Sequence, residues 1–320
     1  MKQLATKSAK DIWPEIPDSM PGKIKVALQH PHYHDVLIFI GGEMPHWIKK
    51  FINAMENSSN GFSGRNMRYM NGNINLKMIE KVWRLNNTGY NTLRVIPKLT
   101  DDHFNKNAHS RMRVHLAAQI LSKNVQRMLT DYCGIDPERL KEYEHAIEII
   151  TKLDTVIDIW NHPINKNFKR EENEKRYESI NAINHRYIDY LEEVLVWFNS
   201  WKSWSTEVVK DNNAFMPQTL FESYAWLVYG IKGVAMQLPL GSAMNQRHGG
   251  TDDLEHEFAT TRHKNPNPTL AETRGMLGKQ TGHRAANFTK NMKSNSRGDK
   301  NTSIKYLCQN LRRKRYNDNK

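Results

Sequence analysis

The spacing of hydrophobic residues predicts a series of amphipathic helices in the middle of the chain. Apolar side chains recur every three or four residues, the period of one helix face. The stretches with this period run from Val114 to Met128, from Leu140 to Ile157, from Tyr187 to Trp201 and from Leu220 to Val234. Helices in such close succession, without intervening strands, imply an all-helical block.

A different pattern precedes this block. Val36 to Ile40 is a short apolar run, rich in β-branched residues and followed by two glycines, which predicts a buried strand. After Pro45, apolar residues from Trp47 to Met55 form one helical stripe, and proline suits the first turn of a helix. Glu43 therefore lies at the joint between a strand and a helix. The predicted fold class is mostly α with a small α/β part.

Polar stretches separate these elements. Residues 57–75 and 161–174 are rich in polar residues and predict loops, with a helix expected near residues 76–85. Late in the chain, Thr251 has the character of a helix N-cap, with Asp252 in the first turn of the helix that follows.

The overall composition favours a folded intracellular protein. Of the 320 residues, 38% are hydrophobic and 25% are charged, which excludes a wholly disordered chain. No apolar window is long enough for a membrane span, and the N-terminus lacks the features of a secretory signal. Two distant cysteines, Cys133 and Cys308, cannot build a disulfide framework or a cysteine-rich zinc site. A reducing compartment fits these observations best.

The net charge of +13 is concentrated at the C-terminal end. Residues 284–320 hold eleven Lys or Arg and two Asp or Glu, a surplus of +9, which leaves +4 for the rest of the chain. Such a basic tail can neutralise nucleic-acid phosphates or serve as a nuclear address. The alternative interpretation is a solvated run of charge without a specific partner.

Acidic residues at two places are candidate metal ligands. Glu43 follows the predicted strand, and Asp252 and Glu255 are three residues apart, on one face of the predicted late helix. Carboxylates are the ligands that Mg²⁺ prefers in phosphoryl-transfer sites. Each of these acids is equally explained as a charge that stabilises a helix N-terminus. The residues alone leave both interpretations open.

Several segments, in order, resemble P-element-type transposases over residues 35–280. Glu43-Met44-Pro45-His46-Trp47-Ile48-Lys49-Lys50 is similar to the Asp-x-Pro-His-Leu-x-Lys-Asn segment of that family. The other matching segments are Pro97–Thr100 with His103, Arg111–Gln119, Asp158-Ile159-Trp160-Asn161, Asp252–Phe258 with Arg262, and Asn267-Pro268-Thr269.

The resemblance implies a partial ribonuclease-H-like core interrupted by an all-helical, GTP-binding insertion. It assigns the incomplete core to residues 1–100, the insertion to 101–240, the C-terminal catalytic helix region of the core to 241–283 and the basic tail to 284–320.

The same resemblance implies the ligands. Mg²⁺ would be held by Glu43 and Glu255, with Asp252 as a close neighbour. Asp158 and Asn161 would contact the guanine of GTP. For Asn161 the alternative is that it simply ends a helix.

Three departures from the family pattern bear on activity. No acidic strand that would carry the family's first catalytic Asp precedes Glu43, and Glu replaces Asp at position 43 itself. A cysteine–histidine zinc finger is also missing from the sequence. The chain therefore resembles a C-terminal portion of a cut-and-paste DNA transposase, incomplete or inactive alone.

Three functional hypotheses follow. The first is a nuclear, Mg²⁺-dependent transposase portion that cleaves and joins DNA at transposon ends and target, acting as a homo-oligomer and without membrane contact. The second is a non-catalytic DNA-binding or interaction protein derived from a transposase. The third is a plain helical nucleotide-binding module.

Overall fold

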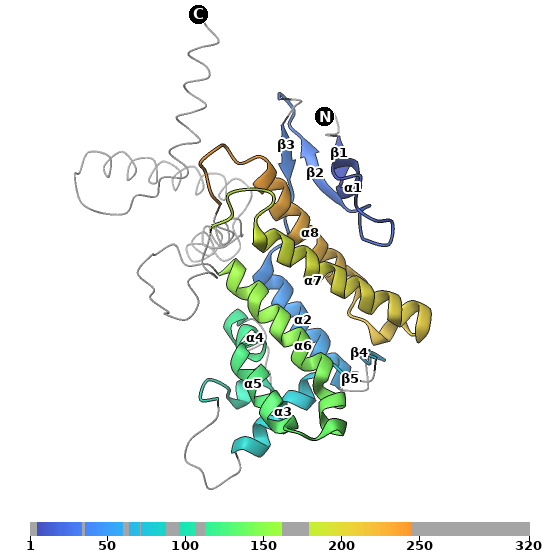
Figure 1. Ribbon diagram of the computed structural model, residues 1–320, viewed down its shortest axis with the longest axis vertical. Coiled ribbons are helices and arrows are strands. Elements are labelled where there is room, and N and C mark those ends of the chain that lie inside the picture. The colour runs from blue at the N-terminus through green and yellow to red at the C-terminus, as the bar shows by residue number, and fades with distance from the viewer. Residues whose placement is uncertain are drawn as a thin grey trace, which may run out of the picture. The chain divides into compact units, whose positions relative to one another are not determined.

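The sequence folds into a set of packed helices with a small sheet built from its first strands (Figure 1). The computed structural model describes residues 5–33, 36–59, 64–70, 72–87, 96–105, 113–161 and 179–244. The chain divides into two units, residues 1–239 with 244–249, and residues 240–243 with 250–320. All elements below belong to the first unit. Asp252, Glu255 and the basic tail lie outside the described residues.

The first strands form an antiparallel sheet in the order β1-β2-β3. Its elements are β1 (Thr6–Ser8), the short helix α1 (Ala9–Ile12), β2 (Lys25–Gln29) and β3 (Leu37–Phe39). Across the β2–β3 pair, Leu28 faces Ile38 and Ala27 faces Phe39.

Strand β3 confirms the predicted strand, but the prediction that it is buried was wrong. Ile38 and Ile40 are 44% and 40% exposed. In the described part of the chain β3 is an edge strand, and its side chains alternate between the two faces of the sheet. Phe39 points to the covered face and packs on Trp13, whereas Ile38 points to the other face. A ribonuclease-H-like core therefore stays a prediction.

Helix α2 (Met44–Ser59) confirms the predicted stripe, because its apolar positions from Trp47 to Met55 are buried. The loop predicted for residues 57–75 is wrong in part. It contains the end of α2 and a hairpin of β4 (Arg68–Tyr69) and β5 (Gly72–Asn73). After it come α3 (Leu76–Asn87), where a helix was expected, and the 3-10 turn η1 (Asp101–His103).

The helical block is present, with one correction. Its elements are α4 (Val114–Ile120), α5 (Lys123–Cys133), α6 (Pro137–Trp160), α7 (Arg186–Ser203), the π-helical turn η4 (Trp204–Val208), the 3-10 turn η5 (Asn212–Ala214) and α8 (Gln218–Met236). The apolar stripe from Val114 to Met128 therefore spans two helices. The chain is extended at Ser122, whose hydroxyl donates to the Gln119 carbonyl at 2.8 Å and so accounts for one of the last carbonyls of α4.

Helix α6 begins where the sequence supplies a cap. The Asp136 carboxylate accepts the backbone N–H groups of Glu138 and Arg139, and Pro137 occupies the first turn. No helix among the described residues is both long and apolar enough to cross a membrane.

Helix α8 approaches the connector between β3 and α2 backbone to backbone. A Cβ atom added to Gly230 would lie 2.5 Å from the Gly41 Cα, and one added to Gly42 would lie 2.7 Å from the Ser223 carbonyl oxygen. A Cβ on Gly233 would lie 2.0 Å from the Phe39 ring. These separations are below van der Waals contact, so the close approach depends on glycine from both sides.

This contact predicts that replacing Gly230 with alanine destabilises the protein, although Gly→Ala usually stabilises a helix. Gly→Ala inside a helix normally stabilises by about 1 kcal/mol. We expect Gly230→Ala to lower the free energy of unfolding by roughly 1–3 kcal/mol instead, because the new methyl group collides with backbone atoms of the connector. Chemical denaturation of the full chain measures the change. The exposed Val234→Ala on the same helix is the control, with a change within about 0.5 kcal/mol. A Gly230→Ala protein more stable than the parent would refute the contact.

Candidate functional site

Glu43 lies immediately before α2 and next to Gly41 and Gly42, the glycines that contact α8. Its backbone carbonyl accepts the Trp47 N–H at 3.0 Å, the first hydrogen bond of the helix. Its side chain is only 15% exposed, and its carboxylate contacts the Nδ1 atom of His46, one turn further on. The sequence therefore placed Glu43 correctly at a strand–helix joint. A negative charge is also favourable there, because the helix N-terminus carries a partial positive charge.

Trp47 fixes the first turn of α2 against α8. Its indole Nε1 donates to the Leu220 carbonyl at 2.8 Å, and its ring stacks on Phe51 at 5.2 Å between centroids. Further ring contacts join it to Phe198 of α7 and Tyr224 of α8. The backbone beside Glu43 is thus held both by the glycine contacts and by this buried aromatic group.

The metal site predicted from the sequence is represented by Glu43 alone. Asp252 and Glu255 fall outside the described residues, so their approach to Glu43 stays a prediction. Within the described ranges, no group of three His, Cys, Asp or Glu side chains is arranged to hold a metal ion. Glu43 offers a hard oxygen donor at a rigid position, which fits one ligand of a Mg²⁺ site.

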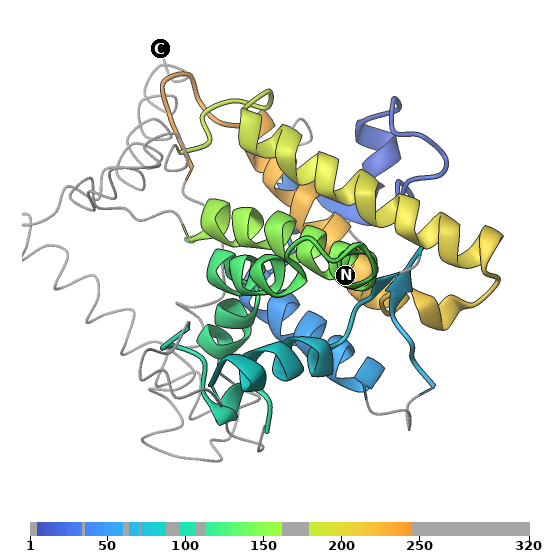
Figure 2. The ribbon, with the colours of Figure 1, turned by 60° about the horizontal axis from the view of Figure 1, so that its bottom comes forward.

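The predicted guanine contacts lie together at the end of α6. Asp158 is half-buried in the last turn, and Asn161 is the exposed C-cap, with its N–H bonded to the Ile157 carbonyl at 2.9 Å. The interpretation that Asn161 ends a helix is therefore confirmed. Its contact with a nucleotide stays a prediction. Figures 1 and 2 show α6 ending, and α2 beginning, toward the same end of the helical layer.

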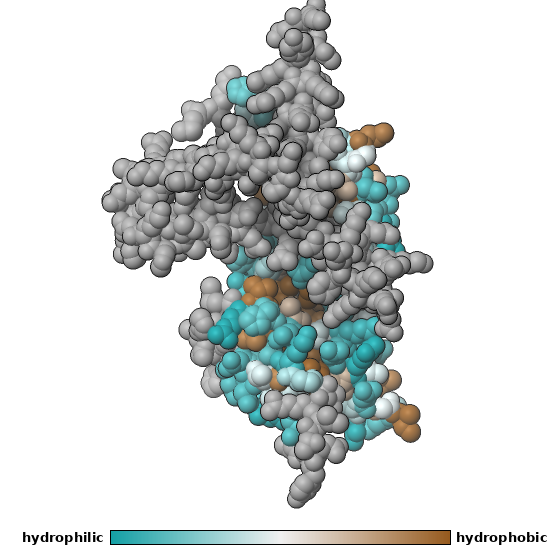
Figure 3. Space-filling model, turned by 90° about the vertical axis from the view of Figure 1, so that its left-hand side faces the viewer, coloured by the Kyte–Doolittle hydropathy of each residue, from teal (hydrophilic) through white to brown (hydrophobic). Residues whose placement is uncertain are grey.

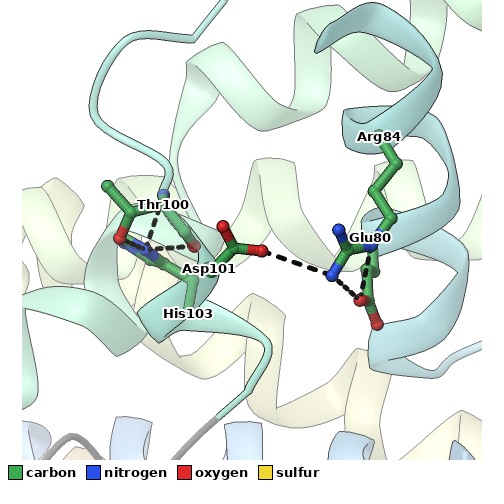
Figure 4. Close-up of polar contacts among 5 residues, drawn as sticks. All are labelled: Glu80, Arg84, Thr100, Asp101 and His103. Carbon is green, nitrogen blue, oxygen red and sulfur yellow. Dashed lines mark hydrogen bonds and ion pairs between the residues drawn. The ribbon is translucent and has the colours of Figure 1, made fainter. Parts of the chain in front are cut away.

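Nothing in the sequence indicates that His103 is buried and hydrogen-bonded. His103 is 1% exposed, and its Nδ1 atom accepts the Thr100 N–H at 3.0 Å (Figure 4). An amide N–H can only donate, so we assign the ring proton to Nε2, which donates to the Gln119 side-chain oxygen at 2.8 Å. This neutral ring joins η1 to α4 across sixteen residues, a separation without helical period.

An exposed ion pair ties the same segment to α3. Arg84 contacts the Glu80 carboxylate at 2.7 Å and the Asp101 carboxylate at 3.3 Å (Figure 4). These contacts raise the pKa of the Arg84 guanidinium, chiefly through the hydrogen bond to Glu80.

Figure 3 shows that the described surface on the left-hand side is mostly hydrophilic, with a small apolar area near its middle.

Comparison with known proteins places these features in a family context. A family model described as a TNP-like, GTP-binding insertion domain matches residues 46–175. A solved structure, the Drosophila P element transposase strand transfer complex, superposes with a TM-score of 0.57 and 16% sequence identity. Over residues 46–175 the chain is similar to this domain family, and its fold is similar to part of the P element transposase.

The structural match covers only part of the Drosophila protein. The superposition covers 79% of this chain but 53% of the Drosophila chain, so this chain spans about half the length of that relative. At this identity the superposition establishes a shared fold. None of the curated proteins matches the chain. The family match begins at residue 46, whereas the resemblance implies that the insertion begins at residue 101. The domain boundaries stay predictions.

The His103 network predicts a difference between buried and exposed polar contacts. We expect Gln119→Met to lower the free energy of unfolding by about 1–3 kcal/mol, because the buried Nε2–H of His103 loses its acceptor. Arg84→Met removes the neighbouring exposed ion pairs and should cost less than about 1 kcal/mol. Urea denaturation of both variants checks the order. Equal losses would mean that Gln119 is not the acceptor of a buried proton.

Proposed function

We propose that this chain is the C-terminal portion of a P-element-like cut-and-paste DNA transposase. The observation that carries the proposal is the family match to a GTP-binding insertion domain over residues 46–175. That match begins three residues after Glu43, the acid at which the Asp-x-Pro-His resemblance expects a metal ligand. In this proposal the protein acts on DNA in the nucleus, as a homo-oligomer.

Glu43, Glu255 and Asp252 are the proposed Mg²⁺ ligands. Bound Mg²⁺ would activate a water molecule, and later a DNA 3′-hydroxyl, for attack on a phosphodiester. The contribution of the chain is to hold the Glu43 carboxylate at a fixed place. The glycine contacts and Trp47 do this on two sides of the connector.

Asp158 and Asn161 are the proposed guanine contacts. The last turn of a helix exposes carbonyl groups and carries partial negative charge, so it suits hydrogen-bond donors and repels phosphates. The Watson–Crick edge of guanine has two donors, N1–H and the 2-amino group, which a carboxylate such as that of Asp158 accepts. The proposal therefore puts the base, and not the phosphates, at the end of α6.

A non-catalytic DNA-binding protein derived from a transposase is the second candidate. The contact between the Glu43 carboxylate and His46 favours it, because it gives the acid a partner that is not a metal. The Glu at position 43, where the family pattern has Asp, points the same way.

The two candidates differ in their response to Glu43→Gln. If the chain is a nuclease, this variant should reduce Mg²⁺-dependent nicking of supercoiled DNA by at least about a hundredfold, because the carboxylate that binds the cation is lost. Glu144→Gln, an exposed acid on α6, is the control and should nick like the parent. Unchanged nicking by Glu43→Gln would exclude Glu43 from the metal site. A parent chain that does not nick would favour the second candidate.

GTP recognition has its own test in the full chain. Asp158→Asn should weaken GTP binding by at least about tenfold, because a charge-assisted hydrogen bond is replaced by a neutral one. It should also reduce the preference for GTP over ITP, which lacks the 2-amino group. Asp154→Asn is the matched control, one turn earlier on α6, where the side chain accepts the Lys123 N–H at 3.0 Å. Calorimetry measures both. Equal effects of the two variants would point to a general loss of structure.

A further inference from the structure

We infer that the solvent-facing side of α2 holds the phosphate backbone of duplex DNA beside Glu43. The surface consists of His46, Lys49, Lys50 and Asn53, called the α2 stripe below. The inference rests on the proposed function and deepens it, since it names the surface that would bring DNA to the candidate carboxylate.

The helical period puts the α2 stripe in line with Glu43. At 100° per residue, positions 46, 50 and 53 fall within a quarter turn of position 43 when projected along the helix, and position 49 lies next to them. Ile48, Phe51 and Met55 occupy the buried side of the helix. Glu43 lies at the border between the two sides, because the buried Trp47 projects about 40° from it in the other direction. On the stripe, Lys50 is exposed, Lys49 and Asn53 are half-buried, and the His46 side chain is 44% exposed.

The two lysines of the stripe have no counter-charge in the described part of the chain. Between Glu43 and Glu56 the sequence has no acidic residue. No ion pair of the described residues includes Lys49 or Lys50. Other lysines differ: Lys232 lies 2.6 Å from Glu192, and Lys152 lies 3.6 Å from Glu193. Two neighbouring positive charges without a counter-charge, beside an amide, complement a polyanion.

The geometry directs this charge toward Glu43. Seven residues separate Glu43 from Lys50, which is about 10 Å along the helix axis. Side chains on a helix lean toward its N-terminus, so the lysine ammonium tends to reach back along the stripe. A carboxylate alone repels a phosphate, and the lysines offset that repulsion. Their compact ammonium groups are suitable phosphate contacts.

DNA binding by the full chain, measured without divalent metal, tests the inference. We would titrate a fluorescent 20-base-pair duplex of mixed sequence over a series of salt concentrations. Lys49→Ala with Lys50→Ala should raise the Kd about tenfold at low salt and reduce the salt slope by about one to two, as expected for one or two lost phosphate contacts. Lys50→Glu alone should weaken binding further than Lys50→Ala.

Lys141→Ala is the matched control, because Lys141 is exposed near the start of α6 between acidic residues. It should change neither the Kd nor the slope by more than about twofold. Thermal midpoints equal to that of the parent show that each variant folds. The basic tail is present in every variant, so its contribution cancels in the comparison.

The outcomes separate this inference from the proposed function. An unchanged Kd and salt slope in the double variant overturns the α2 stripe, whether or not the parent nicks DNA. A parent that does not bind duplex DNA, or that binds duplex RNA or an acidic peptide more tightly, overturns it as well. Loss of binding in the double variant, together with a parent that shows no metal-dependent nicking, supports the stripe while the catalytic proposal fails.

Discussion

The structure depends on one close approach between two backbones. Gly41 and Gly42, which connect β3 to α2, lie against α8 at Gly230 and at the Ser223 carbonyl, with no room for a Cβ atom at Gly42 or at Gly230. Because most residues of α8 are buried, this contact fixes the connector to the core of the first unit. The sheet on one side and α2 on the other take their positions from it.

Buried aromatic residues extend this local contact by joining α2, α7 and α8 to one another. Trp47 joins α2 to α7 and α8 next to the connector. One turn beyond Phe198 on α7, the Trp201 indole donates to the carbonyls of Arg68 and Ala214, at 2.7 Å and 3.1 Å. The β4–β5 hairpin and the segment before α8 are therefore held by one side chain. Two buried tryptophans with satisfied N–H groups, both near the C-terminal end of α7, leave little freedom for the helices to slide there.

The sequence predicted those parts of the fold whose cause is a local period. Helices α2, α6, α7 and α8 were found because their buried residues recur every three or four positions. The break between α4 and α5 was missed, since Leu121 and Val125 keep the apolar period through it. The exposure of Ile38 was missed for a related reason, because an apolar run looks the same at the edge and in the middle of a sheet.

The candidate site shows the same division. Glu43 and its partner His46 are three residues apart, a spacing that the helical period makes visible. His103 and Gln119 are sixteen residues apart in different elements, and only the folded chain brings them together. Glu43 and the pair Asp252 and Glu255 are likewise far apart in the sequence, so their separation depends on the fold. Residue patterns can propose that such acids converge, but packing decides it.

In the proposed function, binding and cleavage of DNA would place different requirements on this chain. Cleavage needs several carboxylates to converge on cations, with distances that one extra methylene disturbs. Binding needs only positive charge on an exposed, well-anchored surface, which tolerates loss of any single acid. The Glu43 carboxylate has His46 as a partner, and α2 is anchored through Trp47, so neither depends on a bound metal. A descendant of a transposase that lost its chemistry would therefore keep the helix, the lysines beside it and the capacity to hold a phosphate backbone.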